Sequence, residues 1–308
     1  MKAVVVDHIV KKYSTGKNKN VVDALKGVSL EVDRGEIFGI IGPDGAGKTS
    51  LFRILTTLLI PEGGRATVDD FDVVKDYKQI RRRVGYMPGR FSLYQDLSVQ
   101  ENLEFFATIF NTSIQENYTL INEIYQQIEP FKTRRAGQLS GGMKQKLALC
   151  CALIHKPSVL FLDEPTTGVD AVSRKEFWEM LHRLKTEGIT ILVSTPYMDE
   201  AGLCDRVALI QKGEILSINT PKGITGEFKK PIWAIKAHEM YPLLKAIKVS
   251  PAVESVYPFG QVHHVVFRDP GDDRARLWEI VKGGSYTGVE IASIQPNIED
   301  CFMALMKD

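Results

Sequence analysis

The chain has 308 residues, of which 44% are hydrophobic and 25% are charged, which is ordinary for a globular protein with a sizeable core. The 39 lysines and arginines nearly balance the 38 aspartates and glutamates, so no global field would recruit nucleic acid or anionic lipid. The longest apolar run, Leu147 to Ile154, is far too short to span a membrane. We therefore expect no nucleic-acid partner, and if the protein works at a membrane, something other than its own helices must hold it there.

The start of the chain, "MKAVVVDHIV", reads as a strand with charges close behind it and not as a signal peptide. The four cysteines show no metal-ligand spacing, and two of them are adjacent, which suits no disulfide framework. We expect all of them to be reduced thiols of a cytosolic protein. They are Cys150, Cys151, Cys204 and Cys301.

An apolar strand at residues 37–41 leads into the loop "GPDGAGKT", and a helix pattern follows. This is the P-loop arrangement G-x-x-x-x-G-K-[ST] in the strand–loop–helix context that it requires. Its glycines let backbone N–H groups converge on phosphate oxygens at a helix N-terminus. Lys48 would reach the outer phosphates, and the Thr49 hydroxyl would bind Mg²⁺. The predicted nucleotide-binding residues here are Gly42, Pro43, Asp44, Gly45, Ala46, Gly47, Lys48, Thr49 and Ser50.

A second apolar strand, "SVLFLDEP", ends in two carboxylates, Asp163 and Glu164. The carboxyl ends of buried parallel strands line the crevice in which such sheets bind ligands. Asp163 suits Mg²⁺ coordination through water, and Glu164 is then placed to polarise a water that attacks the γ-phosphate. The pattern predicts Thr49 and Asp163 as metal ligands and Glu164 as the catalytic residue.

The segment "LSGGMKQ" at residues 139–145 stands between these two motifs and resembles the signature sequence of ABC-type ATPases. "TTGVDAVSR" is similar to the loop that follows in this family, with Asp170 at its aspartate position. Tyr13 in "VKKYSTG" matches the aromatic residue that stacks on adenine, a contact worth roughly 1–3 kcal/mol. Aromatic residues also favour strands without any ligand. The resemblance runs from about Lys2 to Thr220.

The resemblance implies an α/β fold for residues 1–225, namely a P-loop ABC ATPase core. This core combines a RecA-like sheet, an antiparallel β subdomain and a helical subdomain at about residues 90–155. It implies ATP and Mg²⁺ as cofactors. It also implies that the start of the signature helix caps the γ-phosphate held by a second ATP-binding domain, so that two ATP molecules join two domains. The capping residues would be Ser140, Gly141, Gly142 and Met143.

Two positions depart from the family pattern. The family has a glutamine, which reaches the metal and the water, where this chain has Gly89 in "VGYMPGRFSLYQDL". Gln95 lies further on, in the part expected to face a membrane partner, and we do not expect it to substitute. The family has a histidine that touches the γ-phosphate at the end of the strand "ITILVST", where this chain has Pro196. Proline has no N–H to donate and no acid–base group.

Both missing groups belong to the same site, and three interpretations follow. The chain could bind ATP but hydrolyse it slowly, and lend its signature to a better equipped partner in a heterodimer. A homodimer with two weakened sites that still turn over through Glu164 is the alternative. Deliberate inactivation of the site by substitution is the third.

The pattern changes after residue 225, and residues 226–308 predict a small α+β accessory domain. "PIWAIKA" reads as a strand, "HEMYPLLKAIKV" as a helix, and "VESVYPF" with "VHHVVFR" as a hairpin around Gly260. A helix, "DDRARLWEIVKG", and a strand, "VEIASIQP", complete the β-α-β-β-α-β order of ferredoxin-like domains. His263 and His264 should point to opposite faces of their strand, which argues against a metal site. The final segment resembles the tail helix of drug-export-like ABC subunits.

The resemblance implies the ATP-binding subunit of an ABC transporter, an exporter that acts with transmembrane permease subunits at the cytoplasmic face of the membrane. The transported substrate is not visible in this sequence. One alternative is a soluble, non-transport ABC protein of translation or DNA repair, although the interval from Thr49 to Leu139 has no coiled-coil insertion. Another is a regulatory ATP-binding protein with little hydrolysis.

Overall fold

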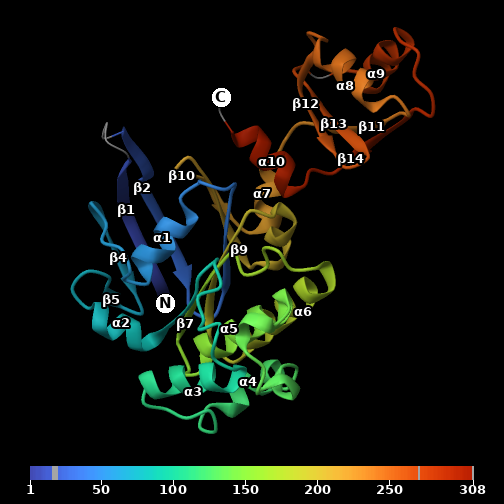
Figure 1. Cartoon of the computed structure of the whole chain (residues 1–308). Coiled ribbons are helices and arrows are strands. Elements are labelled where there is room, and N and C mark those ends of the chain that lie inside the picture. The colour runs from blue at the N-terminus through green and yellow to red at the C-terminus, as the bar shows by residue number, and fades with distance from the viewer. Residues whose placement is uncertain (16–19, 270, 307–308) are drawn as a thin grey trace. The chain divides into compact units, whose positions relative to one another are not determined.

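The computed structural model describes residues 1–15, 20–269 and 271–306. The chain divides into two compact units, Met1–Pro221 and Lys222–Asp308, which are described separately (Figure 1). The predicted boundary after residue 225 lies inside a helix, α7 (Pro221–Glu227).

The centre of the first unit is a six-stranded sheet in the order β10-β9-β3-β8-β7-β6. Five strands are parallel, and β10 pairs antiparallel with β9. Every residue of β3, β7 and β8 is buried, as expected for parallel strands that are covered on both faces. The strands are β3 (Ile37–Ile41), β6 (Val84–Met87), β7 (Val159–Asp163), β8 (Thr190–Thr195), β9 (Arg206–Gln211) and β10 (Glu214–Asn219).

A four-stranded antiparallel sheet in the order β2-β1-β4-β5 forms a second layer of this unit (Figure 1). Helix α1 (Lys48–Leu55) shares one apolar core with both sheets, and its Phe52 meets Phe161 of β7 edge to face at 5.6 Å. This core fixes the start of α1 next to the carboxyl ends of the parallel strands. The antiparallel strands are β1 (Lys2–Thr15), β2 (Asn20–Asp33), β4 (Gly63–Val68) and β5 (Phe71–Asp72).

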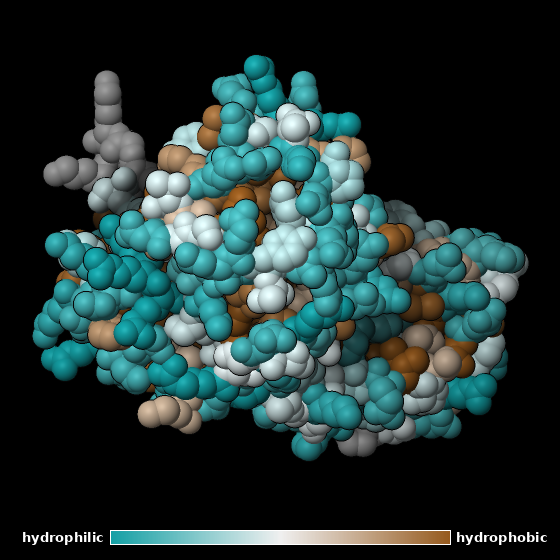
Figure 2. Space-filling view, turned by 90° about the horizontal axis from the view of Figure 1, so that it is seen from below, coloured by the Kyte–Doolittle hydropathy of each residue, from teal (hydrophilic) through white to brown (hydrophobic). Residues whose placement is uncertain are grey.

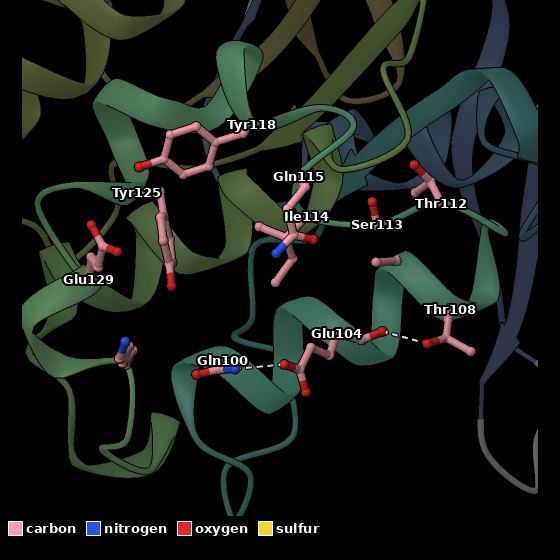
Figure 3. A pocket seen from close by; sticks show the side chains of 12 residues that line it. Gln100, Glu104, Thr108, Thr112, Ser113, Ile114, Gln115, Tyr118, Tyr125 and Glu129 are labelled. Atoms are coloured by element: carbon pink, nitrogen blue, oxygen red, sulfur yellow. Dashed lines mark hydrogen bonds between the residues drawn. The ribbon is translucent and has the colours of Figure 1, made fainter.

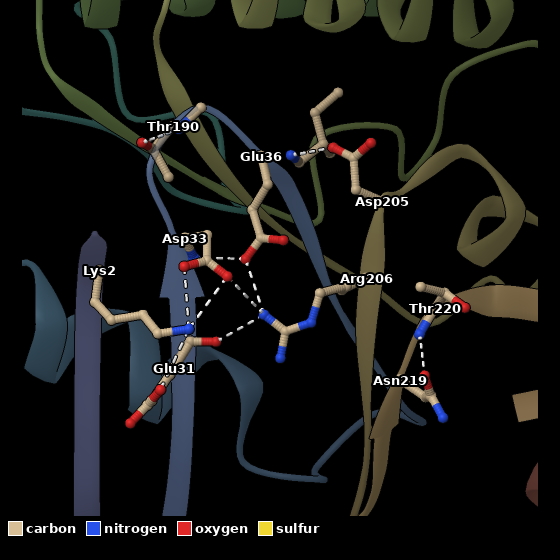
Figure 4. Close-up of polar contacts among 11 residues, drawn as sticks. Lys2, Glu31, Asp33, Glu36, Thr190, Asp205, Arg206, Asn219 and Thr220 are labelled. Atoms are coloured by element: carbon tan, nitrogen blue, oxygen red, sulfur yellow. Dashed lines mark hydrogen bonds and ion pairs between the residues drawn. The ribbon is translucent and has the colours of Figure 1, made fainter. Parts of the chain in front are cut away.

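A polar network joins the two sheets at the amino ends of β3 and β9 (Figure 4). Lys2 Nζ pairs with Asp33, and Arg206 Nη1 lies 3.1 Å from Glu36 Oε1. The N–H of Ile37 donates to Asp205 Oδ2 at 2.8 Å. Burial raises the pKa of Glu36, and the hydrogen bond from the Asp33 N–H opposes that rise. The network lies at the amino end of β3, opposite the end that carries the predicted phosphate loop.

The predicted helical subdomain is present as α3 (Val99–Ile109), α4 (Tyr118–Tyr125) and α5 (Gly141–Leu153), with short 3-10 turns at Glu129–Phe131 and Ala136–Gln138. Ser98 and Glu101 form a capping box that fixes the start of α3. Figure 2 views the molecule from the side on which α3 and α4 lie in Figure 1. Most residues on this face are hydrophilic, and small groups of apolar residues lie between them. The remaining elements of this unit are α2 (Tyr77–Arg83), α6 (Ala171–Thr186) and the 3-10 helix η3 (Met198–Leu203).

The second unit has the element order β-α-β-β-α-β and one antiparallel sheet in the order β12-β13-β11-β14. This is the ferredoxin-like arrangement. Helices α7 and α10 (Ile298–Leu305) flank this motif in the sequence. The elements of the motif are β11 (Ile232–Lys236), α8 (Met240–Lys248), β12 (Val253–Phe259), β13 (Val262–Phe267), α9 (Asp273–Lys282) and β14 (Glu290–Ile294).

The four cysteines are all buried free thiols. Among the residues that the structure describes, no helix has the length and apolar character needed to cross a bilayer.

Candidate functional site

The loop between β3 and α1 forms a tight backbone cradle. Gly45 and Gly47 have φ of +78° and +106°, in the left-handed region that favours glycine. A Cβ at Gly47 would lie 2.4 Å from the carbonyl oxygen of Ala24, and one at Gly42 would lie 2.1 Å from that of Ile210. Side chains at these positions would therefore force the loop away from β2 and β9. This close packing explains why the sequence motif has glycine at these positions.

The cradle opens onto a cavity of 510 Å³ at the N-terminus of α1. Free N–H groups of a first helical turn favour anions, and phosphate in particular. Pro43 and Asp44 are exposed residues of the loop and do not line the cavity, whereas the residues from Gly45 to Ser50 do. The lining consists of Val22, Asp23, Ala24, Lys26, Gly45, Ala46, Gly47, Lys48, Thr49, Ser50, Glu164 and Lys212.

Lys48 is held under the loop by three oxygen atoms. Its side chain is buried, and Nζ donates to the carbonyl oxygens of Gly42 at 2.8 Å and Pro43 at 3.1 Å. Nζ also lies 3.1 Å from Glu164 Oε1. A buried ammonium is costly unless it is paired. The carboxylate of Glu164 provides that pairing here, at the position where an outer phosphate of a nucleotide would bring its own negative charge.

Thr49 and Asp163, the two predicted metal ligands, lie together beside the cradle. Thr49 Oγ1 donates to Asp163 Oδ1 at 3.2 Å, and the Asp163 carboxylate is buried. No group of three or more His, Cys, Asp or Glu side chains in the described parts of the chain is arranged to hold a metal ion. Magnesium is commonly bound through one or two carboxylates together with phosphate oxygens and water. One hydroxyl and one carboxylate next to a phosphate cradle fit such a shared site.

Glu164 has an unusual backbone, with φ of +51°. Non-glycine residues rarely adopt this region, and such strain concentrates at functional sites. Its N–H donates to the carbonyl oxygen of Ser194 at 3.0 Å and lies 3.1 Å from Ser194 Oγ, which holds this conformation. The turn directs the Glu164 carboxylate into the cavity towards Lys48.

Ser194, on β8, is a site residue that sequence analysis missed. Its hydroxyl donates to Asp163 Oδ1 at 2.6 Å, so one serine orients both carboxylate residues. The parallel register of β7 with β8 sets Asp163 opposite Ser194. The available signal was a serine and a threonine at the carboxyl end of the otherwise apolar strand "ITILVST".

Tyr13 lies beside the cradle but does not line the cavity. Its hydroxyl is 3.1 Å from Ser50 Oγ, so β1 and the start of α1 bring these two predicted residues together. Lys11 Nζ lies 5.7 Å from the centre of the Tyr13 ring. The structure therefore places Tyr13 next to the predicted phosphate site.

Gly89 and Pro196 border the same site. A Cβ at Gly89 would lie 3.0 Å from the carbonyl oxygen of Asp163 and 3.7 Å from Glu164 Cβ, so a side chain there would meet the carboxylate turn. Pro196 directly follows Thr195, whose carbonyl oxygen accepts the N–H of Gly42 at 3.3 Å. Gln95 instead accepts the N–H of Gly137 through its own carbonyl oxygen, in the helical subdomain.

The signature residues lie on a different surface from the cradle. Ser140 is the N-cap of α5, and its Oγ accepts the N–H of Met143 at 3.3 Å. Ser140 and Gly141 are exposed, and Gly142 lies against Ser173 near the start of α6. Asp170 caps α6 by accepting the N–H groups of Val172 and Ser173. The structure thus brings the loop, Asp163 and Glu164 together, and leaves the start of α5 open to solvent.

A cavity of 660 Å³ in the helical subdomain contains none of the predicted site residues (Figure 3). Its wall includes Tyr118 and Tyr125, whose rings meet edge to face at 6.2 Å, and Glu104, which accepts a hydrogen bond from Gln100 at 2.7 Å. Glu104 and Glu129 would repel a nucleotide phosphate. The cradle is therefore the better candidate for the nucleotide site.

A phosphate-binding loop between a buried parallel strand and a helix, with two carboxylates at the end of a neighbouring strand, defines a P-loop nucleotide-binding protein. The family described as ABC transporter matches residues 25–167. The chain is 32% identical over 321 residues to the doxorubicin resistance ATP-binding protein DrrA of Mycobacterium tuberculosis, covering 99% of this chain and 94% of that protein. The chain belongs to the ABC transporter family of ATP-binding proteins.

Other relatives and solved structures agree with this assignment. The probable multidrug ABC transporter ATP-binding protein YbhF of Escherichia coli is 36% identical over 310 residues, which is 99% of this chain but 52% of that protein. The chain thus spans about half the length of this relative. The bacterial ABC transporter cassette MJ0796, solved as a dimer, is similar at a TM-score of 0.64 and 27% identity, over 70% of this chain and 98% of that one. The predicted ABC ATPase core is confirmed.

Proposed function

We propose that this chain is the ATP-binding subunit of an ABC exporter. The observation that carries the proposal is the closed geometry of the cradle, in which Lys48, Thr49, Asp163 and Glu164 meet at the N-terminus of α1. The loop and Lys48 would bind the phosphates of ATP, and Thr49 with Asp163 would hold Mg²⁺, which would neutralise charge on the phosphates. Tyr13 would contact the adenine. These roles follow from the donor set of the site.

A second ATP-binding domain is part of the proposal. The exposed start of α5 offers Ser140, two glycines and Met143 to an anion, but it is not part of the chain's own cavity. A phosphate held by another domain would satisfy the free N–H groups of this helix. The cassette MJ0796, which this chain resembles, is described as dimeric, which supports the same arrangement here.

We further propose that the chain's own site is degenerate. Glu164 would act as the base that polarises water, but no side chain at position 89 supports it, and Pro196 offers no group for the γ-phosphate. A heterodimer with a fully equipped partner is the leading form of the proposal. A homodimer with two slow sites is the alternative.

The docking site for the membrane subunits is proposed to be an apolar groove of 640 Å³ in the first unit. Leu58, Met87, Leu93, Phe106 and Ile109 supply apolar side chains to its wall. Exposed apolar grooves of this kind receive the apolar face of a helix. A helix from a permease subunit would bind this groove and hold the chain at the cytoplasmic face of the membrane. The names of relatives such as DrrA and YbhF support export as the direction of transport.

Fractionation of cells that express the full chain with its permease subunits tests this function. We expect the wild-type chain to be recovered with the membrane fraction, and Ile109→Lys, in the wall of the groove, to be released from it. Ile109 is 55% exposed, so the substitution should leave the fold intact. Val74→Lys, at a residue 47% exposed outside the groove, is the matched control and should stay with the membrane. Recovery of the wild-type chain with ribosomes or RNA would instead favour a non-transport ABC protein.

A further inference from the structure

The ferredoxin-like sheet of the second unit has one face that the helices α8 and α9 do not cover. Val265 and Phe267 of β13 belong to the apolar core that these helices share with the sheet. Side chains alternate along a strand, so His264 and Val266 lie on the opposite face. In the β12–β13 ladder, His264 pairs with Tyr257, and Val266 with Ser255. All four residues line a cavity of 700 Å³.

Helices α7 and α10 form the opposite wall of this cavity. They lie side by side (Figure 1), and the thiol of Cys301 on α10 donates to the carbonyl oxygen of Ile224 on α7 at 3.6 Å. Cavities of roughly 300–1,000 Å³ are typical of sites for small molecules. The two helices and the residues directly after them add apolar side chains to the wall, namely Ile224, Phe228, Met303, Ala304, Leu305 and Met306.

His264 is the polar group built into this apolar wall. It is 8% exposed, its ring stacks on Phe259 at 4.0 Å, and Nδ1 lies 2.8 Å from Oδ1 of the buried Asp300. The other oxygen of Asp300 accepts the N–H of Asn297 at 2.9 Å. An ionised carboxylate can only accept hydrogen bonds, so Nδ1 of His264 carries the proton of this bond. With Nδ1 as the donor to Asp300, the neutral tautomer of the ring presents Nε2 as an acceptor.

Nε2 of His264 has no hydrogen-bond partner among the described residues, and it is not one of the buried polar atoms that are sealed from solvent. His263 provides the contrast, because its Nε2 is bound to the carbonyl oxygen of Met240, and its Nδ1 is sealed without a partner. The acceptor on His264 is thus fixed in orientation by Phe259 and Asp300 and open to the cavity. An acceptor that is fixed in orientation in a mainly apolar wall selects a ligand that donates a hydrogen bond.

The charges at the rim of the cavity balance one another. Two exposed lysines, Lys229 and Lys230, and two exposed glutamates, Glu227 and Glu254, line the cavity, and Lys230 pairs with Glu254. This rim favours neither an anion nor a cation. We propose that the second unit binds a neutral, amphipathic small molecule, whose apolar body lies between the sheet and the helices α7 and α10 and whose hydroxyl group donates to Nε2 of His264.

Calorimetric titration of the full chain with 2-naphthol and 2-methoxynaphthalene tests the proposal, because the two probes share an apolar body and only the first has a hydroxyl donor. We expect 2-naphthol to bind with one site per chain, and about tenfold more tightly than the methoxy compound, as one hydrogen bond to the oriented Nε2 would give. Absence of 2-naphthol binding, or equal binding of both probes, would overturn the proposal.

Three variants locate the binding. His264→Asn keeps a donor near the position of Nδ1 for Asp300 and removes Nε2, so it should bind both probes equally. Ala304→Trp places an indole ring in the cavity from an exposed position of α10, and this variant should bind neither probe. His182→Asn, at an exposed histidine on α6, is the control and should retain the tenfold preference. Unfolding curves confirm that each variant is folded. If a folded Ala304→Trp variant still bound 2-naphthol, the probe would occupy another site. If binding disappeared as the chain self-associated, the cavity would be an interface with a second copy. Either result would overturn the proposal.

Discussion

Single residues decide what the cradle can do, and Lys48 is the first of them. Its ammonium contacts two loop carbonyl oxygens and Glu164, so it already occupies the position from which an outer phosphate would be bound. An arriving phosphate would share this charge with Glu164 and free the carboxylate to contact water. In this way the same lysine would link nucleotide binding to the state of the proposed base.

We predict that Lys48→Ala weakens Mg-ATP binding by about 100-fold, because a charge-assisted contact to phosphate is lost and no nearby side chain replaces it. Isothermal titration calorimetry of the full chain measures the change. Lys175→Ala, at an exposed lysine of α6, should leave the affinity unaltered. An unchanged dissociation constant for Lys48→Ala would refute the assignment of the cradle.

The proposal that the site hydrolyses ATP slowly depends on two residues, Gly89 and Pro196. Loss of a positioned acid–base group costs ~10²–10⁴ in rate. We predict that Pro196→His alone recovers little activity, and that Gly89→Gln with Pro196→His recovers more than the product of the two single effects. The Gly89→Gln side chain must displace the Asp163 carbonyl oxygen slightly, since its Cβ would lie 3.0 Å away. The variants are compared by their single-turnover rates of ATP hydrolysis at matched ATP occupancy. If the double variant recovered only the product of the two single effects, the two residues would not act on a shared transition state.

At the scale of elements, the position of the site depends on how the two sheets of the first unit are joined. Asp69, in the turn between β4 and β5, pairs with Arg34, with Arg83 at 3.3 Å, and with the Ser158 hydroxyl at 3.2 Å. It therefore connects the antiparallel sheet to α2 and to the segment that enters β7. Burial of Asp69 opposes its ionisation, but Arg34, followed by Ser158 and Arg83, outweighs burial and lowers its pKa.

We predict that Asp69→Asn lowers the free energy of unfolding by about 1–3 kcal/mol at pH 7. A depressed carboxylate pKa stabilises the fold above the pKa of the unfolded chain, and this contribution is lost as the pH falls through the folded pKa. The difference between wild type and Asp69→Asn should therefore shrink below about pH 4. Asp70→Asn, at an exposed neighbour that also pairs with Arg34, is the control. Equal effects of the two substitutions, or a difference that grows in acid, would contradict this role.

Local sequence patterns predicted the elements well where the signal was contiguous. The loop "GPDGAGKT" and the strand "SVLFLDEP" each carry their structural context within about ten residues, and the hairpin around Gly260 is marked by strand alternation. Ser194 could not be assigned, because its contact with Asp163 depends on the register between β7 and β8. The pairing of His264 with Asp300 joins residues 36 apart in sequence, and no local pattern indicates it.

At the scale of the whole molecule, the chain carries a nucleotide cradle and a signature helix whose first residues do not line the cavity of that cradle. Ser140 is exposed at the start of α5, so the N-terminus of this helix is accessible to another molecule. The proposed division of labour between two domains would follow from where α1 and α5 begin.

We predict that Ser140→Arg leaves nucleotide binding by the isolated chain intact but suppresses ATPase activity in the complex with its partner domain. A bulky cation at the cap would block the approach of the partner's phosphate loop. Calorimetry on the isolated chain and steady-state hydrolysis by the complex give the two readouts. Ser285→Arg, at an exposed serine of the second unit, should alter neither. Loss of ATP binding by the isolated Ser140→Arg chain would show that the signature serves its own site.

The single-turnover rate of ATP hydrolysis by the isolated wild-type chain tests the central claim most directly. We predict Mg-ATP binding with hydrolysis slower by ~10²–10⁴ than in a fully equipped site, even at protein concentrations that allow self-association. Addition of the complete partner domain should raise turnover of the complex without raising the rate in this chain's own site. Hydrolysis by the isolated chain at an ordinary enzyme rate of about 1 s⁻¹ or more would contradict the degenerate site and leave Glu164 sufficient by itself.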